Sequence, residues 1–330
     1  MTVLVIGGAG YIGSHTVRQL EKAGFDVLIV LDNLVKGHRE AVGNAQFVLA
    51  DINDKSALEE VFATHKIDAV MHFAAYSLVG ESVVKPDIYY RNNVGGTLNL
   101  LEAMVRYEVP YLVFSSTAAV YGEPQEVPIP EEHPTIPTNP YGATKLAVEG
   151  MLKWFGEAYC LKYASLRYFN AAGADIAGDI GEDHNPESHL IPLVLKAALG
   201  NVPEIKVFGN DYPTPDGTCI RDYIHVTDLA DAHVKALEYL TGGGKSEVFN
   251  LGNGQGFSVL EVLRTAEEVV GNTIPYSIAP RRAGDPAVLV ASADKAKRVL
   301  GWQPQYGELK TIISTAWSWH KKHPKGFGDK

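Results

Sequence analysis

The segment that decides the fold is Thr2-Val3-Leu4-Val5-Ile6-Gly7-Gly8-Ala9-Gly10-Tyr11-Ile12-Gly13. Its first five residues are apolar or β-branched and predict a buried strand, and a helical pattern of apolar residues follows the glycines. A dinucleotide pyrophosphate requires bare backbone at such a turn, free N–H groups at the helix start and no Cβ where helix meets strand. Gly7, Gly10 and Gly13 can meet these requirements, so this turn is a candidate dinucleotide site.

Glycine-rich turns also serve plain strand-to-helix connections, so the motif alone is weak evidence. Asp32 strengthens the nucleotide interpretation, because it ends the next predicted strand, about 20 residues further on. A carboxylate at this place can accept hydrogen bonds from the adenosine ribose hydroxyls and would repel a 2′-phosphate. The pattern therefore favours NAD over NADP as the cofactor.

Short apolar runs alternate with longer periodic segments through the first half of the chain, which is typical of a parallel sheet with helices on both faces. We expect strands at 2–6, 27–31, 46–50, 69–73, 111–114 and 163–167. We expect helices at 12–23, 55–64, 94–107 and 141–159. The predicted fold class is therefore α/β, a doubly wound parallel sheet of Rossmann type with a smaller C-terminal α/β domain.

The second half of the chain has long connections rich in Gly, Pro and Asp around one predicted helix at 191–199, and such connections are typical of functional loops or domain joints. We expect an NAD-binding domain over residues 1–172 and a substrate-binding domain over residues 173–330. A further strand is predicted at 246–252, so the chain is expected to return to the first domain at about 222–252.

The composition limits the classes of partner. With 46% hydrophobic and 21% charged residues the chain lies in the ordinary globular range. A net charge of −10 without a basic run argues against a nucleic-acid surface. The sequence shows neither a secretory signal nor a run of roughly 20 uncharged apolar residues, which predicts a cytoplasmic protein that does not enter a membrane. Cys160 and Cys219 have no metal-ligand spacing, so no metal site is predicted.

Tyr141-Gly142-Ala143-Thr144-Lys145 places a phenol and an ammonium group four residues apart, hence on one face of a predicted helix. A tyrosine with a pKa of roughly 10 is a poor base at neutral pH, but a neighbouring cation and the positive nicotinamide ring favour its phenolate. Such pairs are commonly exposed surface pairs; the preceding glycine turn and strands favour catalysis here. Thr117, just after the fifth strand, is the predicted hydrogen-bond donor to the reacting substrate oxygen. Ser115 and Ser116 are more simply explained by bonds to loop backbone.

Two further stretches are open to both a cofactor and a structural interpretation. Asp51 follows the third predicted strand and can contact adenine, although an aspartate that caps the helix approach at Lys55 explains it equally well. Phe73-Ala74-Ala75 leaves the fourth strand with small residues where the sheet edge could approach a cofactor. Close helix packing is the alternative explanation for these small residues.

Several stretches resemble the UDP-glucose 4-epimerase family of extended short-chain dehydrogenases. They are GGAGYIGSHT at 7–16, LDNL at 31–34, FSSTAAVYG at 114–122, NPYGATK at 139–145, LRYFNAAG at 166–173, RDYIHVTDLADAH at 221–233 and RRAGD at 281–285. The resemblance covers nearly the whole chain. The first and fourth stretches mark the broad superfamily, and the last two narrow it towards sugar-nucleotide epimerases.

The resemblance implies a reversible inversion at C4 that interconverts UDP-glucose and UDP-galactose. In such enzymes the residue at Tyr141 removes the proton of the sugar 4-hydroxyl while hydride passes from C4 to a tightly bound NAD. The 4-keto sugar then turns within the pocket and takes the hydride back on its other face. Lys145 is expected to hold the nicotinamide ribose and to lower the tyrosine pKa.

The same resemblance implies the other binding residues. Arg221 and Arg282 are expected to neutralise the diphosphate of the substrate, as forked donors do, and Asp285 to bind near the uridine ribose or the diphosphate. The expected cofactor-binding residues are Gly7, Gly10, Tyr11, Ile12, Gly13, Asp32, Asn33, Asp51, Ile52, Phe73, Ala74, Ala75, Asn92, Ser115, Tyr141, Lys145 and Tyr168. The expected substrate-binding residues are Thr117, Tyr141, Asn170, His189, Leu190, Val207, Phe208, Arg221, Arg282, Asp285 and Leu289.

Some positions depart from the family pattern. Ser77 stands where some members have a lysine near the cofactor, and His189 stands where some have an asparagine that contacts the substrate. Leu289 occupies the place of a bulky tyrosine that closes the pocket of some members against N-acetylated sugars. The smaller side chain leads to the hypothesis that UDP-N-acetylglucosamine is a second substrate.

Three other functions are alternatives to a UDP-hexose 4-epimerase. A 4,6-dehydratase would have an acidic pair after the threonine, where this chain has Ala118-Ala119. A UDP-pentose 4-epimerase remains an alternative, because the shape of the pocket determines which sugar fits and these motifs do not specify that shape. A non-catalytic NAD sensor would not need Tyr141, Lys145 and Thr117 together. The family resemblance also implies a homodimer, through a bundle formed by the helices at 94–107 and 141–159.

Overall fold

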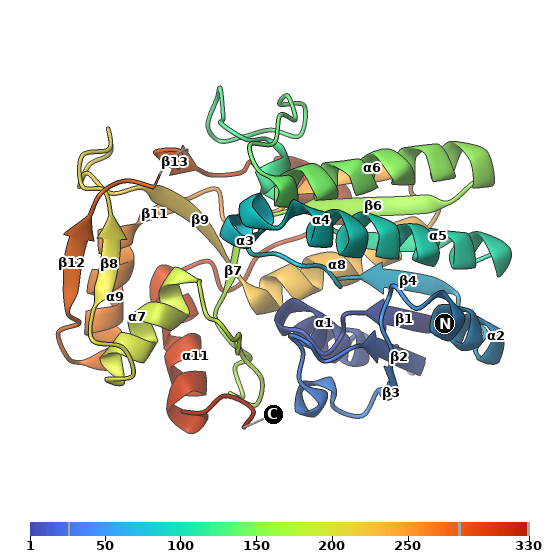
Figure 1. Cartoon of the computed structure of the whole chain (residues 1–330), viewed down its shortest axis with the longest axis horizontal. Coiled ribbons are helices and arrows are strands. Elements are labelled where there is room, and N and C mark those ends of the chain that lie inside the picture. The colour runs from blue at the N-terminus through green and yellow to red at the C-terminus, as the bar shows by residue number, and fades with distance from the viewer. Residues whose placement is uncertain (26, 283–284, 329–330) are drawn as a thin grey trace.

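A seven-stranded parallel sheet dominates the computed structural model, which describes residues 1–25, 27–282 and 285–328 (Figure 1). Its strands are β1 (Thr2–Ile6), β2 (Val27–Asp32), β3 (Gln46–Leu49), β4 (Ala69–His72), β5 (Tyr111–Ser115), β6 (Lys162–Arg167) and β10 (Glu247–Asn250). The strand order is β10-β6-β5-β4-β1-β2-β3, and all neighbours are parallel. The predicted α/β fold class is confirmed.

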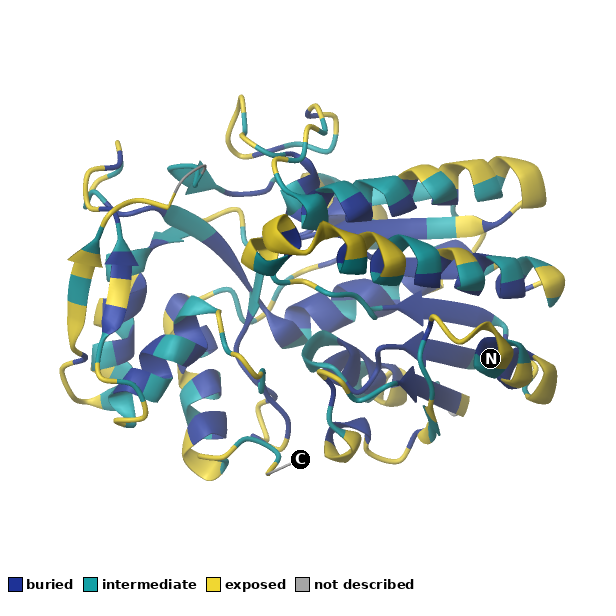
Figure 2. Cartoon of the chain, viewed as in Figure 1, coloured by how far each residue is buried: buried dark blue, intermediate teal, exposed yellow. Residues whose placement is uncertain are grey.

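Helices cover both faces of this sheet, because successive side chains of a strand point to opposite faces. Val3 and Val5 belong to the core on one face, and Leu4 and Ile6 belong to the core on the other. The first core includes residues of α1 (Tyr11–Lys22), α8 (Val226–Thr241) and α10 (Asp294–Leu300); the second includes residues of α2 (Lys55–Thr64), α5 (Gly96–Arg106) and α6 (Pro140–Tyr159). Figure 2 shows the resulting buried central strands.

The strand order reverses direction between β1 and β4. The chain moves outward from β1 through β2 to β3, and it then crosses back to place β4 on the other side of β1. In open α/β sheets ligands bind outside the carboxyl ends of the strands at such a reversal. The glycine turn at 7–13 follows β1 and lies at this place.

The remaining strands and helices form a second, smaller part of the fold. One small sheet contains β7 (Asn170–Ala172), β9 (Ile220–His225), β11 (Gly256–Ser258) and β13 (Val288–Leu289), and a second contains β8 (Ile205–Phe208) and β12 (Tyr276–Ala279). Helices α7 (Leu190–Ala198), α9 (Val259–Val270) and α11 (Leu309–Lys322) form a separate core with them. Between the small strands the chain enters α8 and then β10, which pairs with β6 in the large sheet.

The short elements fall in the connections. They are the helices α3 (Val79–Val84) and α4 (Pro86–Tyr89), the 3-10 turns η1 (Arg39–Val42) and η3 (Ala118–Val120), and a π-helical turn η2 (Tyr90–Gly95). The helix expected at 94–107 therefore has regular α-geometry from Gly96 onward. At Gly96 a Cβ would approach the Ile52 side chain to 2.6 Å, so the helix packs closely there. Within the described residues, no helix has the length and apolar character needed to span a membrane.

Candidate active site

The glycine turn packs against the end of β4. Gly7 has a φ of +78°, and a Cβ on it would lie 2.5 Å from the backbone nitrogen of Ala74. A Cβ on Gly13 would lie 2.2 Å from the carbonyl oxygen of Gly7. Both glycines are therefore required by contacts within the chain, and the predicted small residues at 73–75 help to form this close approach.

Gly10 differs from these two glycines. Among the described residues, a Cβ on Gly10 would meet only the Gly7 carbonyl oxygen, at 3.3 Å. Gly10 is partly exposed, and it precedes the N-terminus of α1, where no described side chain caps the helix. Uncapped N–H groups beside bare backbone form a good site for a phosphate. The turn therefore fits the pyrophosphate of NAD.

Asp32 lies at the end of β2, directly beside the turn. Its carboxylate accepts hydrogen bonds from the backbone nitrogens of Ala9, at 3.0 Å, and Leu34, at 2.8 Å. These two bonds fix the orientation of the carboxylate at the end of β2. The arrangement is compatible with the predicted bonds to ribose hydroxyls.

A chain of polar side chains continues from this point. Asn33 donates a hydrogen bond of 2.7 Å to Asp51, and Asn53 donates to both Asp51, at 2.8 Å, and Asn92, at 3.1 Å. The structure thus brings together Asn33, Asp51 and Asn92, three of the predicted cofactor residues. Asp54 is the N-cap of α2, while the Asp51 carboxylate accepts a hydrogen bond of 2.7 Å from the backbone nitrogen of Asn53 in the turn that leads to this helix, so both interpretations of Asp51 stay open. Ile52, the next predicted residue, is buried.

The predicted catalytic residues converge at the ends of β5 and α6. Tyr141 lies in the first turn of α6. Asn139 is the N-cap of this helix, and its side chain accepts a hydrogen bond from the Gly142 nitrogen. Thr117 follows β5, and its side chain acts on the Tyr141 phenol, opposing a rise in the pKa of that phenol. The Thr117 hydroxyl accepts a hydrogen bond of 3.1 Å from the Ala119 nitrogen, which leaves its own proton for donation to a substrate oxygen. The phenol and the hydroxyl are therefore positioned to act on one substrate oxygen.

Lys145 lies one turn further along α6 and is buried. Its Nζ donates a hydrogen bond of 2.7 Å to the Ser115 carbonyl oxygen, and the Ser115 hydroxyl lies 2.5 Å from the Tyr168 hydroxyl. Buried Asn93 of η2 donates a hydrogen bond of 3.1 Å to the Thr144 hydroxyl, which links α6 to η2. These contacts hold Lys145, Ser115 and Tyr168, all predicted cofactor residues, in one place.

Burial opposes the phenolate in the chain without its cofactor. It raises the pKa of Tyr141, and Thr117 acts in the opposite direction. Burial also lowers the pKa of Lys145 to about 7, with Glu149 acting in the opposite direction. Removing both groups from water disfavours their charged forms. The positive nicotinamide ring of bound NAD is therefore needed to favour the phenolate.

Several predicted substrate residues lie together around β9. Arg221 forms an ion pair with Asp285 and also donates to the Ile220 carbonyl oxygen at 2.7 Å. Leu289 of β13 is the register partner of Arg221 and packs against the core cluster of Ala118, Val120, Tyr121 and Ile129. This packing joins the small sheet to the segment that follows Thr117. Asn170 of β7 donates to the Asp222 carbonyl oxygen at 2.9 Å on the same sheet.

The second predicted arginine lies near β8. The Arg282 guanidinium group lies 4.1 Å from the centroid of the Phe208 ring, which is partly exposed, and Val207 is buried in the core of the smaller part. Arg282 is exposed and therefore accessible to an anion. Ala283 and Gly284 of the RRAGD stretch lie outside the described residues.

His189 has a different environment from the other predicted substrate residues. Its Nδ1 lies 2.8 Å from Glu182 and 3.0 Å from Glu187, and these carboxylates raise its pKa to about 10 against the effect of burial. Leu190, the following residue, begins α7. Sequence reasoning missed Glu182, His184 and Glu187, although two histidines and two glutamates within residues 182–189 were a visible signal.

A second missed feature lies beneath the catalytic segment. Glu149 and Arg167 form a buried ion pair, in which Arg167 Nε donates to Glu149 at 3.0 Å. The Ser116 hydroxyl also donates to Glu149, at 2.6 Å, and Arg167 donates to the Tyr121 hydroxyl at 2.9 Å. The network fixes the 115–121 segment on β6 and α6. No sequence spacing links these residues, which the fold alone brings together.

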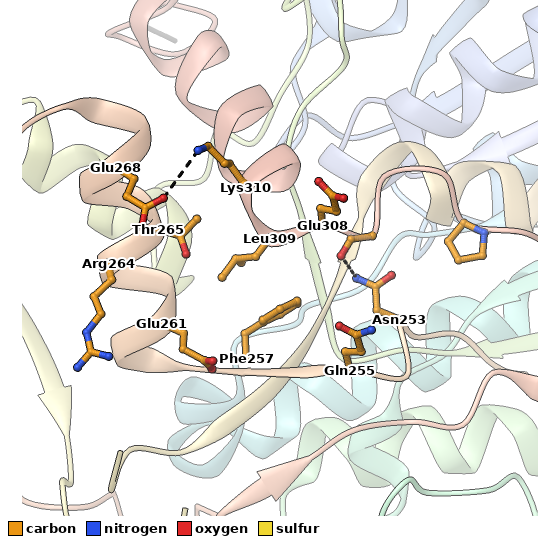
Figure 3. A pocket seen from close by; sticks show the side chains of 12 residues that line it. Asn253, Gln255, Phe257, Glu261, Arg264, Thr265, Glu268, Glu308, Leu309 and Lys310 are labelled. Atoms are coloured by element: carbon orange, nitrogen blue, oxygen red, sulfur yellow. Dashed lines mark hydrogen bonds and ion pairs between the residues drawn. The ribbon is translucent and has the colours of Figure 1, made fainter. Parts of the chain in front are cut away.

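One surface hollow lies apart from this site. A hollow of about 630 Å³ lies in the smaller part between α9 and the start of α11, where Lys310 lies 3.8 Å from Glu268 (Figure 3). None of the predicted site residues lines it. The convergence of Tyr141, Thr117 and Lys145 is therefore the better evidence for the active site.

Comparison with known proteins agrees with this geometry. The NAD dependent epimerase/dehydratase family matches residues 3–252. The chain belongs to this family. A family member named UDP-glucose 4-epimerase from Halalkalibacterium halodurans is 59% identical over 327 residues, which cover 99% of this chain and 98% of the relative. The predicted family resemblance is confirmed.

Solved structures of similar proteins extend the comparison. A crystal structure of UDP-glucose 4-epimerase superposes with a TM-score of 0.98 at 55% identity, covering 100% of both chains. The enzyme of that name from Bifidobacterium longum, solved in complex with NAD⁺ and UDP, has a TM-score of 0.93 at 43% identity, covering 99% of this chain and 100% of that one. Both share the fold of this family member along its whole length.

Proposed function

We propose that this protein interconverts UDP-glucose and UDP-galactose by inversion at C4, with NAD as a bound cofactor. The observation that carries the proposal is the convergence of Thr117 and Tyr141, with Lys145 fixed one helical turn away by its bond to the Ser115 carbonyl oxygen. The similarity to proteins named UDP-glucose 4-epimerase, one of them solved with NAD⁺ and UDP, supports the choice of substrate and cofactor.

The protein's own groups have separate tasks in this reaction. Tyr141 accepts the proton of the sugar 4-hydroxyl and returns a proton to the same oxygen when the product forms. Thr117 donates a hydrogen bond that orients this oxygen. Because the site is buried, the bonds act in a medium of low polarity, where they are stronger than in water. Lys145 supplies a donor for the cofactor ribose beside the phenol.

The glycine turn, Asp32 and the network of Asn33, Asp51 and Asn92 are the groups that would hold NAD. When bound, NAD supplies a hydride acceptor that returns its hydride within the same catalytic cycle. Asp32 would accept bonds from the ribose hydroxyls, and the uncapped N-terminus of α1 would face the pyrophosphate. This division of roles agrees with the partial exposure of Gly10, Asn33 and Asp51.

The substrate diphosphate would bind between the two arginines. Arg221 is held in the structure by Asp285, which prepares a guanidinium group with a fixed orientation. Arg282 is exposed and rests on Phe208. Two forked cations provide the positive charge that a diphosphate requires in a protein with a net charge of −10. Asn170 would contact the sugar from β7.

We also propose UDP-N-acetylglucosamine as a second substrate. Leu289 packs against the segment after Thr117, so the size of this side chain affects the room beside the catalytic pair. Leucine is smaller than the tyrosine that the family resemblance places there in some members. A UDP-pentose is the alternative sugar nucleotide that the same room could hold.

The assembly and domain limits are further proposals. We infer a homodimer formed through α5 and α6, on which Leu98 is 40% exposed and Trp154 is 64% exposed. Exposed apolar side chains of this size favour burial against a partner. We infer a division near residues 172 and 173, with α8 and β10 belonging to the NAD-binding domain.

Incubation of the purified protein with UDP-glucose and no added oxidant tests the proposal. Proton NMR of the product mixture should show UDP-galactose, and starting from UDP-galactose should give the same final ratio. UDP-N-acetylglucosamine and UDP-xylose, run in parallel, separate the hexose and pentose alternatives. Absence of UDP-galactose from a sample that retains NAD would contradict the proposal.

A further inference from the structure

The connection between β7 and α7 carries a compact group of four side chains, Glu182, His184, Glu187 and His189. One nitrogen or oxygen atom of each lies within 4.8 Å of the others. His189 Nδ1 lies 2.8 Å from Glu182 Oε1 and 3.0 Å from Glu187 Oε1. His184 Nδ1 lies 3.2 Å from Glu182 Oε1 and 3.9 Å from Glu187 Oε2. We call these four residues the 182–189 cluster.

Two atoms of the cluster are buried without a hydrogen-bond partner among the described residues, Glu187 Oε2 and His184 Nδ1. The side chains of Glu182 and Glu187 are each only 4% exposed. Burying a carboxylate oxygen without a partner is costly, and native proteins seldom do so unless a water or an ion completes the site. Glu187 Oε2 and His184 Nδ1 lie 3.9 Å apart, and with the His184 proton on Nε2 both atoms offer an electron pair that a cation can accept.

We propose that the 182–189 cluster binds one divalent transition-metal ion of the zinc class, with two imidazole nitrogens and two carboxylate oxygens as ligands. Zinc lies roughly 2.0–2.2 Å from such ligands in a tetrahedron, which places neighbouring ligand atoms roughly 3.3 Å apart. The four separations in the cluster, between 2.8 and 3.9 Å, lie around this value. Calcium and magnesium prefer oxygen ligands alone, and the two imidazoles therefore favour a first-row transition metal.

The surroundings assign the ion a structural role. The His184 ring lies edge-on to the ring of Tyr11, with 6.2 Å between the ring centroids. Tyr11 directly follows Gly10 of the cofactor turn. Trp319 of α11 donates to the Glu182 carbonyl oxygen at 3.2 Å, and His38 contacts the Asp183 carbonyl oxygen at 3.1 Å. A metal ion here would hold the connection between the glycine turn and α11, and it would fix the start of α7.

Metal analysis of the complete, untagged protein tests this inference. After incubation with Zn²⁺ and removal of excess ion, we expect about one zinc per chain. Glu187→Gln keeps the shape of the side chain but removes a charged ligand, and we expect its zinc affinity to fall by about tenfold or more. The matched controls Glu204→Gln and His65→Gln, on residues outside the cluster, should bind zinc as the unchanged protein does.

A spectroscopic measurement on the unchanged protein does not depend on the folding of a variant. Replacement of zinc by Co²⁺ in this protein should give the intense visible absorption of a tetrahedral cobalt site. Failure of the unchanged protein to retain either ion would overturn the proposal and show that a proton on His189 balances the two carboxylates. Equal zinc retention by Glu187→Gln and by the unchanged protein would also overturn it.

Discussion

The Lys145 Nζ donates a hydrogen bond of 2.7 Å to the carbonyl oxygen of Ser115, which ties the catalytic helix α6 to the end of β5. The bond holds the amine at the carboxyl edge of the sheet, one helical turn from the Tyr141 phenol. Burial at this place lowers the pKa of Lys145 to about 7. The same packing that orients the amine therefore makes its charge sensitive to pH.

Lys145 predicts how the stability of the cofactor-free protein depends on pH. An unfolded lysine keeps its proton to a pH of roughly 10.4, so between pH 7 and that value the unfolded chain binds more protons than the folded one. The free energy of unfolding should therefore rise with pH across this window, so that the gain is complete above a pH of roughly 10.4 and is gone once the pH has fallen to about 7. Urea unfolding of Lys145→Met should show a smaller rise, whereas Lys153→Met, exposed on the same helix, should match the unchanged protein. Equal pH slopes in all three proteins would contradict the assignment.

The glycines of the cofactor turn predict two different defects. Gly13→Ala should destabilise the protein by about 1–3 kcal/mol, because the new methyl group meets the Gly7 carbonyl oxygen at 2.2 Å. Gly10→Ala should retain nearly full stability but lose affinity for NAD, because its Cβ enters the space left for the pyrophosphate. Thermal unfolding together with NAD content after purification separates the two effects. A stable Gly10→Ala protein with its full NAD content would show that the pyrophosphate lies elsewhere.

The size of the Leu289 side chain is expected to determine whether the enzyme accepts UDP-N-acetylglucosamine in addition to UDP-glucose. Leu289→Tyr should reduce turnover of UDP-N-acetylglucosamine by on the order of 10- to 100-fold, because the larger side chain fills room beside the segment after Thr117. Turnover of UDP-glucose should change far less and serves as the internal control. Parallel NMR assays measure both rates. An equal loss for both substrates would indicate general damage to the site rather than a size limit.

Trp154 predicts the state of assembly. If α5 and α6 form the contact between two copies, the unchanged protein should sediment as a dimer and Trp154→Glu should shift it towards the monomer. The reason is that an indole 64% exposed in the single chain loses its apolar partner surface when a charge replaces it. Lys162→Glu, on the exposed first residue of β6, is the control for added negative charge. A stable monomer of the unchanged protein would contradict the dimer.

Local patterns predicted the parts of the fold that local chemistry determines. The alternation around β1, the glycine turn and the Tyr141–Lys145 spacing follow directly from strand, turn and helix geometry, and the structure has these elements within a few residues of the predicted bounds. The strand at 246–252 was predicted because its apolar run has the same character as the other buried strands, and it appears as β10 beside β6.

Long-range contacts were beyond the sequence patterns. The buried pair of Glu149 and Arg167 joins residues from α6 and β6 that no local period connects. The burial that raises the pKa of Tyr141 was not predicted either, because neighbouring charge can be inferred from spacing but burial cannot. The 182–189 cluster lies in an irregular connection, where no periodic pattern fixes which side chains face one another.

The most direct test of the catalytic assignment is the rate of UDP-galactose formation by Tyr141→Phe. This change removes the phenol oxygen on which Thr117 acts and leaves the ring in place. The turnover number should fall by on the order of 10²- to 10⁴-fold, while the NAD content and the thermal stability stay close to those of the unchanged protein. A turnover number within about twofold of the unchanged protein would show that Tyr141 is not the proton acceptor.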